Sequence, residues 1–229
     1  MTLIKSISGI RGTIGGKPGN NLTPIDIVES TAAYGTWLKS KYNVHKLKVV
    51  IGRDARISGE MLEKLCIGTL ISLGIDVVNL GLSTTPTVEI AVPKENAQGG
   101  IILTASHNPK QWNALKLLND KGEFISENDG KELLDLIKHQ DFSFSEVDNL
   151  GITIEKDNYL DEHIQDIINL DTVDLEAIEK AKINIVVDAV NSSGGIAVPK
   201  LLKALKCNNV TNIYCEPNGD FPHNPEPLP

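Results

Sequence analysis

A serine and a histidine stand together directly after an apolar segment. The stretch Thr104–Pro109 reads TASHNP and follows Gly100–Leu103, whose composition predicts a buried strand. Ser106 and His107 are therefore expected at the carboxyl end of a strand, the edge where ligands bind in open α/β sheets. A serine oxygen needs a base or a cation to become a good nucleophile, and His107 and Lys116 are both near in sequence. Such pairs are also common in surface loops without a catalytic role.

Three other polar stretches could bind an anion. Residues 8–13 read SGIRGT, and their glycines would let a loop bring backbone N–H groups and Arg11 near a phosphate. Residues 52–56, GRDAR, follow an apolar run and are expected at the same sheet edge, although an internal Arg–Asp network explains them equally well. Residues 191–195, NSSGG, follow Asp188 and begin a predicted helix, so they fit either an anion site or ordinary capping.

Strands and helices alternate around these stretches. Short apolar runs predict strands, and helical spacing of apolar residues predicts helices between them. The order predicts an α/β fold with a mostly parallel mixed sheet flanked by helices. The expected strands are Lys48–Gly52, Ile75–Leu80, Gly100–Thr104 and Leu115–Leu118, and the expected helices begin at Thr23-Pro24, at Ser58 (to about Gly74), at Thr85 (to about Val92) and at Asp129 (to Lys138). In the last strand, Lys116 is expected on the face opposite Leu115 and Leu117.

The periodic pattern weakens between residues 142 and 158, where the sequence turns polar. We place a domain boundary there, giving a first domain at 1–150 and a second at 151–229, with a linking helix that starts near Asn158. The second domain contains only a predicted strand–helix–strand unit: Ile183–Ala189, Gly194–Lys206 and Val210–Cys215. Such a unit is too small for a normal core, so we expect an incomplete second α/β domain, completed by further chain or by a partner.

Composition narrows the function classes. Asp and Glu number 30 against 22 Lys and Arg, a formal net charge of -8, which disfavours nucleic acid and anionic membrane as partners. No apolar run reaches the length of a membrane helix. The 3 cysteines form no CxxC pair, which is typical of reduced thiols in a cytoplasmic protein. No local group of residues has the spacing of a metal site.

Taken together, five stretches resemble the α-D-phosphohexomutase family, which includes phosphoglucosamine mutases, phosphomannomutases and phosphoglucomutases. They are SGIRG at 8–12, GRDAR at 52–56, TASHNP at 104–109 with Asn113 and Lys116 after it, VVDAVNSSGG at 186–195, and PNGDFPHNPEP at 217–227. The resemblance covers essentially the whole chain. It implies the first of the family's four domains and the opening of the second. One departure is Ala114, where family members commonly have glycine after the asparagine.

The resemblance also implies residue roles. Ser106 would carry the transferable phosphate, Arg11 would stabilise it in transfer, and Lys116 would act as a base or clamp. His107 would support the loop or shuttle a proton. Substrate or phosphate contacts are expected from Ser8, Gly12, Arg53, Asn108 and Asn113. Mg²⁺ would bind through the phosphate on Ser106, with carboxylates that the family supplies from a second-domain loop absent from this chain.

The reaction implied is interconversion of hexose 6-phosphate and hexose 1-phosphate through a hexose bisphosphate. The overall match favours phosphoglucosamine mutase, with phosphomannomutase or phosphoglucomutase as the alternative, in a monomer or a homodimer. The isolated chain is expected to be inactive. Two other hypotheses stay open: a hydrolase using Ser106 and His107, for which no acidic triad partner is apparent, and a binding or structural role.

Overall fold

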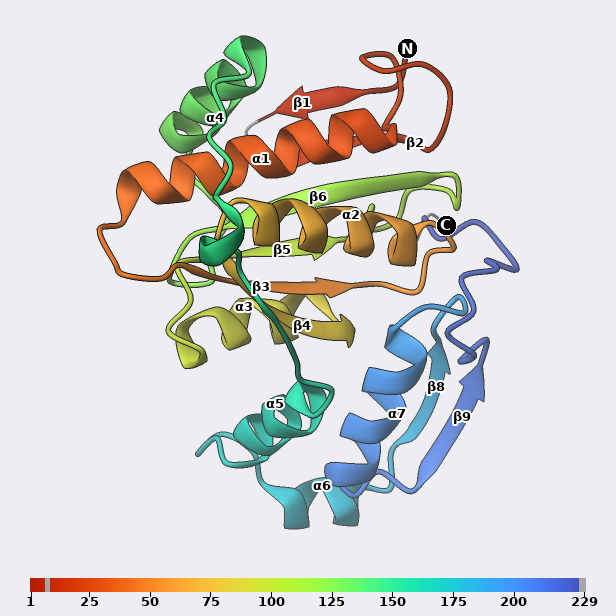
Figure 1. Cartoon of the computed structure of the whole chain (residues 1–229). Coiled ribbons are helices and arrows are strands. Elements are labelled where there is room, and N and C mark those ends of the chain that lie inside the picture. Colours follow the sequence, from red (N-terminus) through yellow and green to blue (C-terminus); the bar gives the residue numbers. More distant parts are fainter. Residues whose placement is uncertain (7–8, 227–229) are drawn as a thin grey trace.

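The computed structural model describes residues 1–6 and 9–226. Its elements form two groups: a seven-stranded sheet covered by helices on both faces, and a smaller unit built on a two-stranded sheet (Figure 1). The described end of the chain runs back to the carboxyl edge of the larger sheet. This return brings residues from both groups to one place.

The larger sheet has the order β1-β2-β6-β5-β3-β4-β7. Neighbours β5, β3, β4 and β7 are parallel, whereas β6 runs antiparallel to both β5 and β2. The predicted α/β class with a mostly parallel mixed sheet is confirmed. The strands are Ile4–Ser6 (β1), Gly9–Thr13 (β2), Lys48–Arg53 (β3), Asp76–Leu82 (β4), Gly99–Leu103 (β5), Trp112–Leu118 (β6) and Thr153–Glu155 (β7).

The expectation of an amino-terminal loop at residues 8–13 is wrong for its described part. Gly9–Thr13 is strand β2, in which Ile10 pairs with Leu115 and Arg11 pairs with Ala114 of β6. Gly9 has φ +116, and a Cβ there would lie 2.4 Å from the Leu115 carbonyl oxygen. The glycines that suggested a loop therefore permit close strand pairing, which local sequence cannot reveal.

Helices cover the two faces of the larger sheet. One face carries α1 (Pro24–Lys41), α2 (Gly59–Ser72) and α4 (Glu127–His139), and the other carries α3 (Thr85–Lys94) and α5 (Tyr159–Ile168) (Figure 1). Two buried apolar clusters fill the space between these layers. Together they hold the strand ends, and hence the loops after them, in fixed positions.

Of the polar residues that precede α1 and α2, one caps its helix and the other does not. Thr23 forms a capping box with Asp26 at the start of α1, as its Thr-Pro sequence favours. Ser58 precedes α2 as predicted but forms no side-chain cap. Its hydroxyl instead accepts a hydrogen bond from the Asn113 side-chain amide at 2.9 Å.

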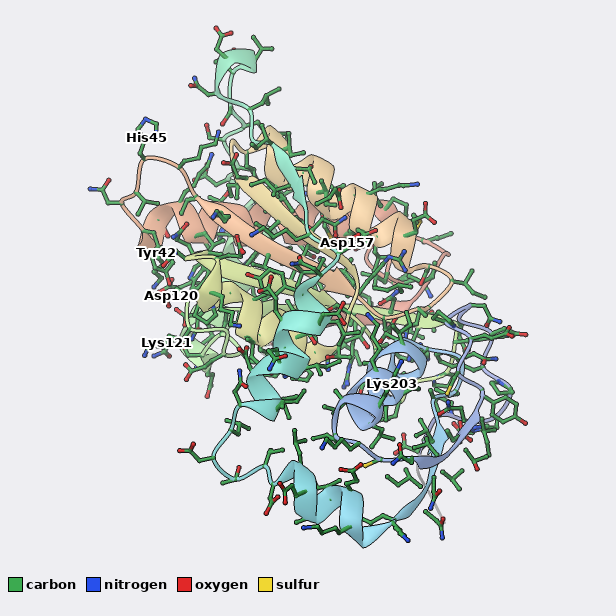
Figure 2. The ribbon with its side chains drawn as sticks, turned by 90° about the horizontal axis from the view of Figure 1, so that it is seen from below. Tyr42, His45, Asp120, Lys121, Asp157 and Lys203 are labelled. Atoms are coloured by element: carbon green, nitrogen blue, oxygen red, sulfur yellow. The ribbon has the colours of Figure 1, made fainter. Side chains whose placement is uncertain are left out.

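The smaller unit contains α6 (Leu175–Ala181), β8 (Asn184–Asp188), α7 (Gly194–Ala204) and β9 (Asn209–Ile213), with β8 and β9 parallel. The sequence pattern indicates its strands and α7 but not α6. Helix α5 packs against both α3 and α7, just after Asp157 (Figure 2). The polar segment before it contributes the short helix η1 (Val147–Asn149) and strand β7. Within the described residues, no helix combines the length and apolar character needed to cross a membrane.

Candidate active site

The loop between β5 and β6 borders a cavity of ≈ 440 Å³. The cavity brings together residues from β2, from this loop, from β6 and from the segment after β6. Its lining includes five of the side chains singled out from the sequence: Arg11, Ser106, His107, Asn108 and Lys116. Side chains that lie far apart in the sequence, such as Arg11 and Lys116, therefore line the same cavity.

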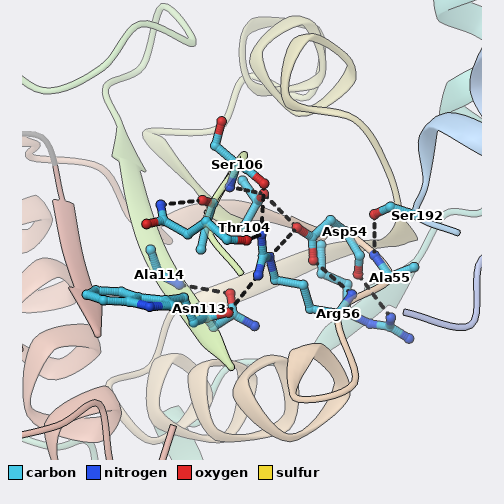
Figure 3. Close-up of polar contacts among 12 residues, drawn as sticks. Asp54, Ala55, Arg56, Thr104, Ser106, Asn113, Ala114 and Ser192 are labelled. Carbon is cyan, nitrogen blue, oxygen red and sulfur yellow. Dashed lines mark hydrogen bonds and ion pairs between the residues drawn. The ribbon is translucent and has the colours of Figure 1, made fainter. Parts of the chain in front are cut away.

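Ser106 occupies an unusual backbone conformation at the mouth of this cavity. Its φ is +57°, in the left-handed region that residues other than glycine rarely adopt. The side chain is exposed, and its hydroxyl points away from the hydrogen-bond network beneath it (Figure 3). Backbone strain of this kind persists only where surrounding contacts enforce it, and it concentrates at functional sites.

Thr104 and Asp54 provide part of that enforcement (Figure 3). The Ser106 backbone N–H donates to the Thr104 hydroxyl oxygen at 3.0 Å, and that hydroxyl donates to the Asp54 carboxylate at 2.6 Å. Both residues are buried. The chain of hydrogen bonds fixes the Ser106 amide to the end of β3, where Asp54 begins the turn.

Arg56 provides the other contacts that hold the Ser106 backbone in its left-handed conformation. Its side chain has 0% exposure, and its Nε donates to the Asp54 carboxylate at 3.1 Å. Its two terminal nitrogens donate to main-chain carbonyl oxygens on both sides of the loop. These acceptors are Ser106 and Asn108 at 2.7 Å each, Pro109 at 2.8 Å and Trp112 at 2.9 Å. Every N–H of the guanidinium is thereby used.

Two cations face the cavity. Pairing of Arg11 with Ala114 sets β2 beside β6, and Lys116 lies on the same face of β6 as Ala114. Leu115 and Leu117 are buried on the opposite face, as predicted. Among the described residues neither cation forms an ion pair, although the Lys116 Nζ lies 5.9 Å from the centroid of the Phe124 ring. Positive charge beside an exposed hydroxyl suits a phosphate group.

The positive charge of Lys116 acts on the carboxyl group of Glu89. Burial raises the pKa of the Glu89 carboxyl above its usual range, and the positive charge of Lys116 partly offsets that rise. Lys116 therefore has an electrostatic interaction with Glu89, although no ion pair joins the two side chains among the described residues.

His107 has an acidic partner, contrary to the sequence expectation. Its Nε2 lies 3.2 Å from a carboxylate oxygen of Glu226, a residue distant in sequence that the return of the chain brings close. No hydrogen bond joins the imidazole to the Ser106 hydroxyl in the described part of the chain. His107 is oriented by Glu226 beside the serine without forming a nucleophile–base contact in this structure.

Comparison with known proteins assigns the chain to a family. The family model for phosphoglucomutase/phosphomannomutase α/β/α domain I matches residues 3–144, and that for domain II matches residues 161–229. The chain belongs to the phosphoglucomutase/phosphomannomutase family.

Individual relatives agree. The chain is 37% identical over 219 residues to a phosphoglucomutase/phosphomannomutase of Thermococcus kodakarensis, covering 94% of this chain and 47% of the relative. It is 31% identical over 204 residues to a phosphoglucosamine/phosphogalactosamine mutase of Sulfurisphaera tokodaii, covering 89% and 42%. The chain thus spans about half the length of these relatives.

A crystal structure of a family protein from Burkholderia thailandensis shares the fold, with TM-score 0.78 at 24% identity over 96% of this chain and 46% of that one.

Not every residue predicted from the family resemblance reaches the cavity. Asn113 is fully buried, with its side chain engaged by Ser58 and by the Ala114 N–H. Arg53 pairs with Glu63 at 3.2 Å, and neither Arg53 nor Gly12 lines the cavity. Ser8 lies outside the described residues. Asn108 does line it, while its side-chain amide closes the loop on the Ala105 carbonyl oxygen at 2.7 Å.

Sequence reasoning missed the residues that hold the Ser106 loop in shape. The sequence predicts either an anion site or an internal network for the stretch that contains Asp54 and Arg56, and it predicts no role for Thr104 or Glu226. The one available signal was the GRDAR stretch at a strand end. Its distance in sequence from Ser106 hides the contact.

The polar loop before α7 is used internally. Asp188 accepts from the Val190 N–H and contacts the His223 Nε2 at 2.9 Å, while the Ser192 hydroxyl accepts from the Ala55 N–H at 3.4 Å. Hydrogen bonding to the Asn224 carbonyl, and then to Asp188, raises the pKa of His223. Ordinary capping, the explanation offered from the sequence, is wrong for Ser193, which forms no side-chain cap at the start of α7. The polar side chains of this loop are instead used in contacts with other segments of the protein.

The described residues contain no cluster of three or more His, Cys, Asp or Glu side chains that could hold a metal ion. A phosphate on Ser106 would supply oxygen, which Mg²⁺ prefers, but its remaining protein ligands are not found in this part of the chain. These residues alone do not make a magnesium site.

Proposed function

We propose that this chain supplies the phosphoserine-bearing part of a phosphohexomutase, which interconverts hexose 6-phosphate and hexose 1-phosphate. The observation that carries the proposal is the exposed Ser106 hydroxyl, held in a left-handed turn beside Arg11 and Lys116, two cations that form no ion pair with any described residue. Family membership supports the same reaction class.

In the proposed reaction, a hydroxyl oxygen of a hexose monophosphate attacks the phosphorus carried on Ser106. The bond from phosphorus to the Ser106 oxygen breaks as the bond to the sugar oxygen forms, giving a hexose bisphosphate. The sugar hydroxyl's proton passes to a base and finally to the serine oxygen. The bisphosphate then returns its other phosphate to Ser106, and the two half-reactions balance. Positioning and charge stabilisation supply most of such catalysis.

Arg11 and Lys116 would stabilise the transferring phosphoryl oxygens, because both line the cavity beside Ser106. We assign proton transfer to Lys116 before His107, because Glu226 occupies the His107 Nε2 and no hydrogen bond joins the imidazole to the Ser106 hydroxyl among the described residues. Asn108 would act through the shape of the loop. Mg²⁺, if bound through the Ser106 phosphate, would neutralise charge, with ligands from outside the described residues; no step here is assigned to it.

For the substrate, we propose glucosamine phosphate, with glucose or mannose phosphate as the alternative. The relatives carry names of both kinds. We also propose that this chain alone does not turn over sugar phosphates. The described residues provide the serine and two cations, but no group of side chains that could hold a metal ion, and the chain spans about half the length of its relatives. Joining it to the part of the Thermococcus relative beyond the matched region should produce turnover, and the ratio of kcat/KM among the three sugar phosphates would then rank them. Turnover by the 229-residue chain alone would contradict the second proposal.

The central test is mass analysis of the purified protein for phosphate. We expect a phosphate on the peptide containing Ser106 after incubation of the joined protein with hexose bisphosphate, and its loss in Ser106→Ala. Ser143→Ala is the matched control, because Ser143 is exposed and lies outside the cavity. A Ser106→Ala protein that still isomerises sugar phosphates would refute the proposal.

One observation favours a second candidate, hydrolysis. The His107–Glu226 pair could activate water against the phosphorylated serine. The same incubations separate the two reactions. Release of inorganic phosphate without isomerised sugar would identify a phosphatase.

A further inference from the structure

The segment at residues 217–226, from the smaller unit, lies against the Ser106 loop at several points. The Phe221 ring centroid is 5.0 Å from the Arg56 guanidinium carbon, a cation–π arrangement. On one side, Asp220 pairs with Lys110 at 3.2 Å, and on the other, Glu226 pairs with His107 at 3.2 Å. Both lysine and histidine belong to the stretch between β5 and β6.

The fit of this segment is close. Gly219 has φ +74, and a Cβ there would lie 2.1 Å from the Ala55 carbonyl oxygen. The main chain of the segment therefore packs directly on the turn that contains Arg56. The Asn191 side chain also donates to the Asp220 carbonyl oxygen at 3.0 Å, which ties the segment to the smaller unit.

Arg56 transmits this contact to Ser106. Its guanidinium holds the carbonyl oxygens on both arms of the loop, including that of Ser106 at 2.7 Å, so rotation of the Ser106 backbone requires breaking these bonds. A side chain stacked on the guanidinium keeps water from competing for its N–H groups. Replacing the Phe221 ring should therefore loosen the Ser106 loop. The replacement removes no residue of the cavity lining, because Phe221 does not line the cavity.

We propose that Phe221 is a positioning residue for Ser106, which acts through Arg56 and couples the smaller unit to the geometry of phosphoryl transfer. The inference rests on the proposed function for its catalytic consequence, but its structural part stands independently. The ion pairs of Lys110 and His107 are half-exposed and contribute little by themselves. The aromatic contact with a fully buried guanidinium is the stronger link.

The test is hydrogen exchange of the amides in residues 104–112 in variants at Phe221. Phe221→Leu keeps apolar bulk and removes the aromatic face, whereas Phe221→Tyr keeps that face. We expect Phe221→Leu to accelerate exchange of these amides on the order of tenfold relative to β4 amides. Phe221→Tyr should keep the protection of the wild type. Phe144→Ala, a change of an exposed phenylalanine, serves as the control and should leave the loop unchanged.

In the joined protein, Phe221→Leu should lower kcat by a similar factor with KM nearly unchanged, and Phe221→Tyr should recover kcat. Loop exchange in Phe221→Leu that matches Phe144→Ala would overturn the inference, even if Ser106 carries phosphate. Faster loop exchange with no phosphate ever found on Ser106 would support the positioning role and refute the proposed function. The two failures are therefore distinguishable.

Discussion

Arg53 and Arg56 belong to the same short stretch, yet the structure uses them in opposite ways. Arg53, at the end of β3, retains 19% side-chain exposure and pairs with Glu63 through one nitrogen. Arg56, in the turn beyond, has 0% exposure and directs every donor at Asp54 or at the Ser106 loop. Identical residue types therefore differ in function because burial, and not charge, decides how many bonds each must form.

The largest expected effect compares the two arginines directly. Arg56→Ala should lower the free energy of unfolding by about 3–5 kcal/mol, because it leaves the Asp54 carboxylate and several loop carbonyls buried without partners. Arg53→Ala should cost less, about 1–3 kcal/mol, because it leaves only the buried Glu63 carboxyl without a partner. Urea denaturation followed by circular dichroism measures both, with thermal midpoints as a second readout. Equal losses would show that burial does not separate the two residues.

A smaller effect is expected at Thr104. Thr104→Val removes the hydroxyl that accepts the Ser106 N–H and donates to Asp54, so we expect a loss of about 1–3 kcal/mol. Thr36→Val is the matched control, because the buried Thr36 hydroxyl has no partner among the described residues. It should change the free energy of unfolding by less than about 0.5 kcal/mol. If both variants lose the same free energy in urea titrations, the network does not support the serine loop.

The smallest effect concerns the partner of Arg53. Burial raises the pKa of Glu63, and the charge of Arg53 only partly opposes it. The folded protein therefore binds the Glu63 proton more tightly than the unfolded chain does, so stability falls as pH rises from about 4.5 through the raised pKa. Glu63→Gln should match the wild type below this window and exceed its free energy of unfolding above it by less than about 1 kcal/mol.

Urea unfolding over a pH series measures this difference. A glutamine variant that is less stable than the wild type at neutral pH would mean that the ion pair outweighs burial. Arg53 and Arg56 would then be more alike than their exposure suggests.

Local sequence was sufficient where an element depends on its own residues. The Thr23-Pro24 start of α1, the apolar runs of β3 and β5, and the placement of Lys116 opposite Leu115 and Leu117 all follow from capping preferences or side-chain periodicity. It failed for β2 and β7, whose existence depends on pairing with β6 and β4. It also missed α6, a short helix without buried residues.

The sequence by itself determined that Ser106 follows a buried strand, because hydrophobic runs and the polar stretch after them are local properties. Only the tertiary structure decided that Arg11 and Lys116 share its cavity, that Arg56 and not Arg53 supports its loop, and that Glu226 faces His107. The physical reason is that burial and hydrogen-bond partners arise from contacts between segments far apart along the chain. Residue type limits which partners are possible, and packing selects among them.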